Sequence, residues 1–265
     1  MTSVYSYSNL GHFGACGNQL FQIASTIGIA LDNGGRPSFP RWEYQPYFSV
    51  PSEFFDGQEG IDRPGEYLQD LKYFGKYFPL IKKYFSPSDY SEQYINQNYY
   101  EVFYKKHFFT KLIAVHVRRA NNVYLPDHHP VCPIEYYEKA IDLVLADQPS
   151  GFDHQLMVFS DDIEWCKEQL VFKNAIFANG NKPDIDPMRL TDAHPLALGS
   201  AAFDLLTMAK CEYHIISNST FSWWGAMLGS SSIKTVYPDP WYGPALQHID
   251  VKNTIIPSYW KGVHR

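Results

Sequence analysis

The second half of the chain alternates short apolar runs with amphipathic segments, and this alternation restricts the fold more than any other feature. The run LIAVHV, residues 112–117, is typical of a strand buried on both faces. Residues 133–148 follow it with apolar side chains at helical spacing. Further strands are predicted at 154–160, 174–178, 213–219 and 234–238, and further helices at 162–170, 200–211 and 220–230. Strands and helices that alternate in this way predict an α/β fold with a parallel, doubly wound sheet.

The first 105 residues have a different pattern. Residues 4–10 predict a strand, and the glycine-rich turn GHFGACG follows them. Residues 18–35 then predict a helix that ends at Gly34 and Gly35. Its apolar face is formed by Leu20, Ile23, Ile27 and Leu31. Beyond this helix the chain is rich in aromatic residues and proline, without regular periodicity. We therefore expect two domains, residues 1–105 and 106–265.

Composition and charge exclude several classes of protein. The formal net charge is −6 and there is no basic block, which argues against a nucleic-acid partner. No apolar run reaches the roughly 18 residues of a transmembrane segment, and the N-terminus has no secretory signal pattern. The cysteines are widely spaced without a CxxC pair, so we expect reduced, buried thiols and a cytoplasmic location. These cysteines are Cys16, Cys132, Cys166 and Cys211.

Polar residues follow the predicted strands where each one ends. Arg118 and Arg119 follow the first strand of the second half, Asp161 and Asp162 the second, and Asn179 the third; residues 217–220, Ser-Asn-Ser-Thr, end the fourth. Open parallel sheets bind ligands beyond the carboxyl ends of their strands. Guanidiniums and a helix N-terminus bind phosphate oxygens, and a carboxylate can accept hydrogen bonds from ribose or guanine. Each residue alone has an ordinary explanation, a solvated charge or a helix cap, but together they indicate a nucleoside diphosphate site.

Two other nucleotide-binding motifs are missing from the sequence. There is no GxxxxGK[ST], so no P-loop lysine holds a phosphate. Gly11, Gly14 and Gly17 do not form GxGxxG, and the nearest acidic residue, Asp32, closes a helix instead of a second strand. A nicotinamide-binding unit is therefore disfavoured.

Five segments resemble the α-1,2-fucosyltransferases of glycosyltransferase family 11. GACGNQLFQIAS resembles their opening GxGNQLFQYA, and AVHVRRANN with HHPVCPIEYYEKAI resembles their HxRRGDY segment and the helix behind it. FSDDIEWCKE resembles FSDDxxW, and IIPSYWKGV resembles a terminal P-x-x-W. DLLTMAKCEYHIISNSTFSWWGAML is similar to their longest motif, which contains NSTFSWW. The matches run from residue 11 to the C-terminus, except that residues 36–105 contain no motif.

The resemblance implies a GT-B-like fold of two facing domains. It also implies GDP-β-L-fucose as donor, inverting α-1,2 transfer to a galactose-containing glycan acceptor, and no metal or other cofactor. The motif positions imply that His116, Arg118 and Arg119 hold the diphosphate and nucleoside, and that Asp161 or Asp162 binds guanine or ribose. The β-phosphate and fucose would be held by Asn218, Ser219, Thr220, Phe221 and Ser222. Gly17 and Asn18 would lie across the cleft, near the fucose and the acceptor.

One departure from the family pattern bears on catalysis. The family's RRGD is Arg118-Arg119-Ala120-Asn121 here, so an amide stands in place of a carboxylate. Asn121 can still accept a hydrogen bond from the donor, but it cannot take a proton. If the reaction needs a base, the candidates are Asp127, His128 and His129.

Two competing hypotheses remain open at this point. One is a non-catalytic relative that binds a sugar nucleotide or glycan, which the loss of the carboxylate at Asn121 favours. The other is a metal-dependent transferase for another sugar nucleotide that uses Asp184 and Asp186. That Asp-x-Asp pair lies in a proline-flanked loop, which is more typical of a turn.

Strand geometry distinguishes the two arginines. Successive side chains of a strand point to opposite faces, so His116 and Arg118 share a face and Arg119 belongs to the other. We therefore expect Arg118 to stabilise the leaving β-phosphate with His116 beside it. Arg119 is expected to pack toward the flank of the sheet or to pair with a carboxylate.

Overall fold

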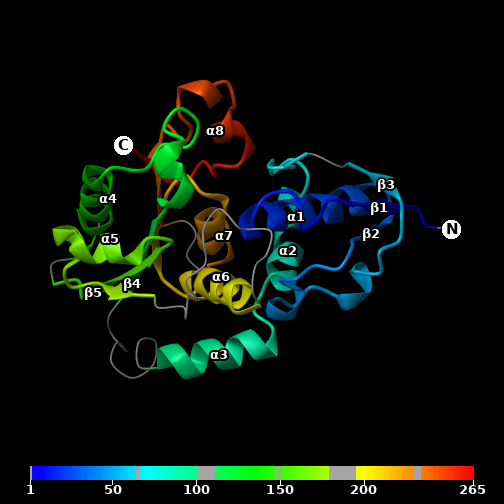
Figure 1. Cartoon of the computed structure of the whole chain (residues 1–265), viewed down its shortest axis with the longest axis horizontal. Coiled ribbons are helices and arrows are strands. Elements are labelled where there is room, and N and C mark those ends of the chain that lie inside the picture. The colour runs from blue at the N-terminus through cyan, green and yellow to red at the C-terminus, as the bar shows by residue number, and fades with distance from the viewer. Residues whose placement is uncertain are drawn as a thin grey trace.

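The computed structural model describes residues 2–63, 66–100, 111–146, 148–149, 151–178, 195–229 and 234–265, and it contains two parallel sheets (Figure 1). We call residues 2–100 the N-terminal half and residues 111–265 the C-terminal half. The predicted domain boundary after residue 105 falls outside the described residues, and so do Asn179, Asp184 and Asp186.

The N-terminal half is built on a small sheet and one long helix. Its elements are β1 (Val4–Ser6), α1 (Cys16–Asp32), β2 (Arg36–Ser38), β3 (Ile61–Asp62), α2 (Phe78–Tyr84) and α3 (Asp89–Tyr100). The strand order is β2-β1-β3, with both pairings parallel. The predicted helix is confirmed, and Leu20, Ile23 and Ile27 are buried. Leu31 is 37% exposed, contrary to expectation, because Ala30 continues the buried face in the last turn.

The C-terminal half is a six-stranded sheet with strand order β6-β5-β4-β7-β8-β9, and every pairing is parallel. Its strands are β4 (Lys111–Val117), β5 (His154–Ser160), β6 (Ile176–Phe177), β7 (Tyr213–Ile215), β8 (Thr235–Asp239) and β9 (Lys261–His264). Its helices are α4 (Ile134–Ala146), α5 (Ile163–Glu168), α6 (Pro195–Met208), α7 (Thr220–Leu228) and α8 (Val251–Thr254). The predicted parallel, doubly wound sheet is confirmed. The edge strand β9 was not predicted, because only Val263 in it packs against the core and no apolar run marks it.

Strand β4 is buried on both faces, as its continuous apolar run predicted. Ile113, Val115 and Val117 pack in one cluster with the buried face of α4. Leu112 and Ala114 belong to a second cluster, which contains residues of α1, α6 and α7. The alternation along the strand therefore directs the even-numbered side chains into the cluster that α6 and α7 share with α1.

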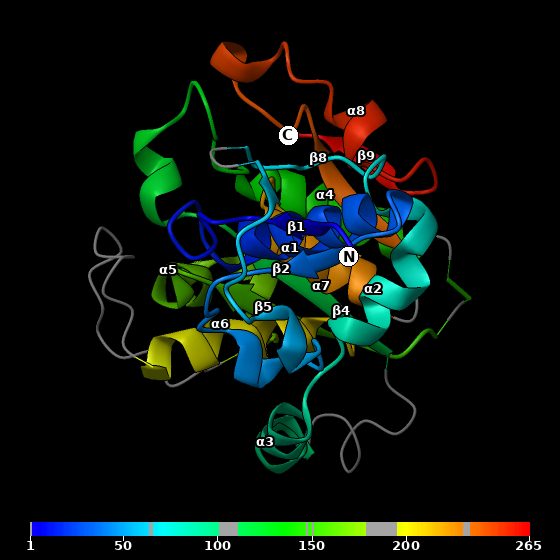
Figure 2. The ribbon, with the colours of Figure 1, turned by 90° about the vertical axis from the view of Figure 1, so that its right-hand side faces the viewer.

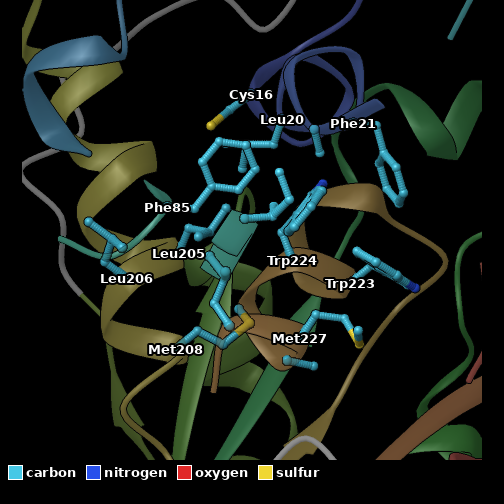
Figure 3. Close-up of a cluster of buried hydrophobic side chains, with 14 of the residues drawn as sticks. Cys16, Leu20, Phe21, Phe85, Leu205, Leu206, Met208, Trp223, Trp224 and Met227 are labelled. Atoms are coloured by element: carbon cyan, nitrogen blue, oxygen red, sulfur yellow. The ribbon is translucent and has the colours of Figure 1, made fainter. Parts of the chain in front are cut away.

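An aromatic core joins the two halves. Phe21 on α1 lies 4.6 Å from Trp223 and 5.1 Å from Trp224 on α7, measured between ring centroids (Figure 3). Trp224 also contacts Phe85 and Phe74 at 5.1 and 5.7 Å. Figures 1 and 2 both place α1 beside α7. Full burial of one such side chain contributes about 1.5–3 kcal/mol, so this core holds the starts of α1 and α7 in a fixed relation.

Sequence patterns also led to expectations about the cysteines and about membrane-spanning helices. Cys16, Cys132, Cys166 and Cys211 are all free thiols and all buried, as predicted. Within the described ranges, none of the helices has the length and apolar character that crossing a membrane requires.

Candidate functional site

The candidate site lies where the sheet changes direction. Strand β4 pairs with β5 on one side and with β7 on the other. The strand order continues from β5 to β6 on the first side and from β7 to β8 and β9 on the second, so it reverses between β4 and β7. Such a switch point is where open α/β sheets bind ligands. Across it, His116 Nδ1 lies 2.7 Å from Ser217 Oγ, and the buried His116 ring is 5.3 Å from the Phe221 ring. The ends of β4 and β7 thus meet, as the sequence predicted for parallel strands.

Arg118 is fixed at the carboxyl end of β4 by two side chains. Its Nη1 donates to Asp161 Oδ2 at 2.5 Å, and its Nη2 donates to Asn121 Oδ1 at 2.7 Å. The other oxygen of Asp161 accepts the backbone N–H of Arg119 at 2.8 Å. A guanidinium has five N–H donors, so these two bonds orient Arg118 and leave it capacity for phosphate oxygens. Asn121, at the altered family position, acts here as an acceptor for Arg118.

Arg119 is oriented differently. Its Nε donates to Asp162 Oδ2 at 2.9 Å, and its guanidinium lies over the Trp165 ring, 4.0 Å from the centroid. Asp162 also caps α5 by accepting the backbone N–H of Trp165 at 3.3 Å. Arg119 therefore packs along the flank of the sheet. The two aspartates expected to bind guanine or ribose hold the two arginines in this structure.

The residues at the start of α7 divide into two groups. Asn218 and Ser222 are buried and serve local structure: Asn218 Nδ2 donates to Pro130 O at 3.1 Å, and Ser222 Oγ donates to the carbonyl oxygens of Ser217 and Ser219. Ser219 is the N-cap and accepts the backbone N–H of Phe221 at 3.3 Å. Ser219, Thr220 and Phe221 are partly exposed. The positive end of the α7 dipole therefore reaches the surface beside β4.

Gly17 and Asn18 lie in direct contact with α7 instead of across an open cleft. A Cβ at Gly17 would stand 2.5 Å from Phe221 N, so only glycine permits this approach. Asn18 Oδ1 accepts hydrogen bonds from Thr220 Oγ1 at 2.8 Å and from Gln69 Nε2 at 2.9 Å. These contacts bring the N-terminal ends of α1 and α7 together. Because the first turn of α1 also contains no acidic residue, the place where the two helices meet favours an anion.

The three candidate bases differ in how exposed their side chains are. Asp127 and His128 are exposed, and their backbone carbonyls accept bonds from Ala245 and Gly243. His129 is only partly exposed, with its ring 5.5 Å from the ring of Tyr242. Burial lowers the pKa of His129, and the charges of His128 and Arg118 lower it further. Its imidazole is thus neutral at neutral pH, and it lies within the electrostatic influence of Arg118.

Several residues of the site were not singled out from the sequence. Trp165, beneath Arg119, stands in the FSDDIEWCKE segment and could have been found there. Gln69 contacts Asn18 from the stretch without motifs, where nothing marks it. Arg265 connects two loops by donating to Tyr242 O at 2.7 Å and to Pro130 O at 3.4 Å.

In the ranges that the structure describes, no group of three or more histidine, cysteine, aspartate or glutamate side chains is arranged to hold a metal ion. The alternative Asp184 and Asp186 pair lies outside those ranges.

Solved structures confirm the fold. The NodZ α-1,6-fucosyltransferase soaked with GDP-fucose matches with a TM-score of 0.57 and 12% identity, over 86% of this chain and 93% of that chain. NodZ from Bradyrhizobium matches with a TM-score of 0.55 and 13% identity, over 86% and 94%. A mutant of Arabidopsis thaliana FUT1 in complex with GDP matches with a TM-score of 0.53 and 15% identity, over 92% and 73%. The expected GT-B-like α/β fold is therefore confirmed.

Relatives in sequence come from Escherichia coli. An alpha-1,2-colitosyltransferase is 35% identical over 137 residues, which are 50% of this chain and 42% of that protein. The O-antigen biosynthesis glycosyltransferase WbnK is 30% identical over 159 residues, 56% of this chain and 47% of that protein. The chain spans about half the length of the curated relatives it matches. The sequence model of the family described as glycosyl transferase family 11 matches residues 37–263, from β2 to β9. Because that match takes in most of the chain, the protein belongs to glycosyl transferase family 11, as its motifs indicated.

Proposed function

We propose that the protein is an inverting transferase that moves L-fucose from GDP-β-L-fucose to a glycan hydroxyl, O2 of galactose. The observation that supports this most is the oriented guanidinium of Arg118, set at the switch point of the sheet beside the start of α7. Family membership supports glycosyl transfer, and the similar NodZ structure was soaked with GDP-fucose.

In the proposed reaction the acceptor hydroxyl attacks C1 of fucose from the face opposite the phosphate. The C1–O bond breaks, its electron pair goes to the leaving β-phosphate, and the acceptor proton passes to the imidazole of His129. Fixed donors aimed at the developing charge are usually the largest catalytic term. Arg118 supplies such donors, and the positive end of α7 adds to them.

The donor nucleotide is tested by ligand-induced stabilisation. GDP and GDP-fucose are expected to raise the melting temperature, and UDP and ADP to leave it nearly unchanged, because the motif set matches users of guanine nucleotides. The shift should grow with concentration as a bound ligand requires. Equal shifts for all three nucleoside diphosphates would remove the selectivity for guanine.

Transfer itself is tested by incubation with GDP-fucose and a panel of galactose-terminated glycans, read by mass spectrometry. A colitosyl donor belongs in the same assay, because the alpha-1,2-colitosyltransferase is 35% identical over half of this chain. Formation of a fucosylated glycan supports the proposal. Binding of GDP-fucose without transfer to any glycan would favour the non-catalytic alternative.

Activity is expected to persist in the presence of EDTA. Arg118 and the N-termini of α1 and α7 supply positive potential at the proposed phosphate position, so a divalent ion adds little to the stabilisation of the leaving group. The rate of transfer is measured after treatment with EDTA and again after addition of Mn²⁺. Loss of activity with EDTA and its return with Mn²⁺ would instead support a metal site at Asp184 and Asp186.

A further inference from the structure

Three aromatic side chains belong to separate loops, two of which are hydrogen-bonded to the start of α7, through Gln69 and Asn18 and through Arg265 and Pro130. Phe13 lies in the glycine-rich turn before α1, Tyr67 follows β3, and Tyr242 follows β8. The rings of Phe13 and Tyr67 are 4.3 Å apart, and Tyr67 is 47% exposed. Burial raises the pKa of Tyr242, and the proximity of Tyr67 raises it further. We call Phe13, Tyr67 and Tyr242 the aromatic platform.

The platform leads to the proposed base. The Tyr242 ring is 5.5 Å from the ring of His129, and His129 in turn lies within the electrostatic influence of Arg118. Phe13 and Tyr67 therefore contribute from the N-terminal half, and Tyr242 contributes from the C-terminal half beside the proposed base.

The backbone that presents Tyr67 is held in an unfavourable conformation. Leu68 has φ of +54°, a region that costs a leucine about 1–2 kcal/mol. Hydrogen bonds fix this turn on both sides: Tyr7 donates to Glu66 O at 2.6 Å, Ser25 Oγ to Leu68 O at 2.8 Å, and Gln69 Nε2 to Asn18. The Leu68 side chain is buried while its neighbour Tyr67 is half exposed. Strain of this kind persists where the surroundings enforce it, and it concentrates at ligand sites.

The other end of the platform is fixed to the start of α7. Arg265 donates to Tyr242 O at 2.7 Å and to Pro130 O at 3.4 Å. Asn218, which precedes the N-cap of α7, donates to the same Pro130 carbonyl at 3.1 Å. These bonds tie the backbone at Tyr242, the loop that contains His129 and the start of α7 to one another.

We propose that the aromatic platform binds the terminal hexose of the acceptor glycan, with the C–H face of the sugar stacked on Tyr67 and Tyr242. Aromatic rings suit this role because they offer a rigid apolar surface and, in tyrosine, a polar edge. A galactose stacked there would present its hydroxyl edge to His129 and to the fucosyl carbon beside Arg118. This proposal rests on the proposed function for the identity of the sugar. Through Tyr67 it assigns acceptor binding to residues 36–105, where the sequence showed no motif.

The test compares Tyr67→Ala with Tyr90→Ala. Tyr90 is a matched control: it is 58% exposed and also packs against aromatic rings, those of Tyr47 and Phe203. It lies on α3, which Figures 1 and 2 both place at the edge of the molecule opposite α8. We expect Tyr67→Ala to raise the acceptor KM about tenfold, the size of one lost stacking contact. Tyr90→Ala should leave the acceptor KM unchanged, and both variants should keep the wild-type shift of melting temperature with GDP.

Saturation-transfer NMR with methyl β-D-galactoside gives a readout that does not need turnover. The signal is expected in the wild type and in Tyr90→Ala and should be lost in Tyr67→Ala, even if no fucosyl transfer is found and the proposed function fails. Three results would overturn the proposal that the aromatic platform binds the acceptor. The first is an unchanged acceptor KM in Tyr67→Ala, and the second is a galactoside signal that is equal in all three proteins or missing from all three. The third is a loss of GDP binding in Tyr67→Ala. The last result would place Tyr67 at the donor.

Discussion

Replacement of Arg118 by lysine should lower kcat by about 10²–10³-fold, as the loss of one fixed donor to a developing oxyanion does. Lysine keeps the charge but loses the planar fork that meets Asp161 and Asn121 and that, in the proposed reaction, also meets a phosphate. Because the negative charge on the β-phosphate develops in the transition state, kcat should fall more than donor affinity does. Steady-state kinetics, together with the melting-temperature shift produced by GDP, separates these two quantities.

Arg119 provides the comparison for this experiment. Its guanidinium lies over Trp165 and its Nε is bonded to Asp162, so Arg119→Lys should mainly loosen the start of α5 and affect kcat much less. If Arg118→Lys and Arg118→Ala keep kcat near wild type while Arg119→Ala abolishes it, the two arginines have been assigned in reverse. If none of these variants changes turnover, the transferase proposal itself is wrong.

The hydrogen bond of Asn121 suggests a reason why an amide at the altered family position is compatible with the proposed activity. Its Oδ1 orients Arg118, a task that an amide performs as well as a carboxylate. A carboxylate there would add a second negative partner to Arg118 besides Asp161, whereas the amide leaves more of the positive charge for a phosphate. The proton, which an amide cannot take, then needs a base elsewhere, and we propose His129 for that role.

The C-terminal sheet could be predicted from the sequence because its central strands are buried on both faces. Between Leu112 and Val117 the run that became β4 is apolar except for His116, and the predicted bounds of β5 are those observed. The meeting of His116 with Ser217 followed from the parallel order, since strand ends of such a sheet share one edge.

The remainder of the site depends on contacts between distant segments. Gln69 reaches Asn18 across 51 positions, and Tyr67 is turned outward by a leucine in the left-handed region. Neither is marked by periodicity or turn residues, because Leu68 would ordinarily avoid such a φ. The direct contact of Gly17 with Phe221 was also not foreseeable, since it follows from packing of Phe21 on Trp223 and Trp224.

A glutamine in place of His129 should lower kcat by about 10²-fold, the lower end of the range for general acid–base catalysis. The lower end applies because an oxocarbenium-like centre is electrophilic enough that the acceptor loses its proton late. His128→Gln and Asp127→Asn are the matched comparisons, since both side chains are exposed members of the same loop. A larger loss in either of these than in His129→Gln would move the base to that residue.

The pH profile tests the same assignment independently. The base must be neutral, so activity falls as the pH drops through the pKa of His129. Burial, His128 and Arg118 all lower that pKa, so kcat/KM for the donor, which reports the free enzyme, should persist below the usual range of imidazole. Bound diphosphate brings negative charge that raises the pKa, and the acidic limb of kcat should therefore lie at higher pH than that of kcat/KM. Arg118→Ala removes one lowering influence, so it should move the limb of kcat/KM upward, whereas His129→Gln should abolish the limb. An acidic limb that survives unchanged in His129→Gln would show that another group titrates.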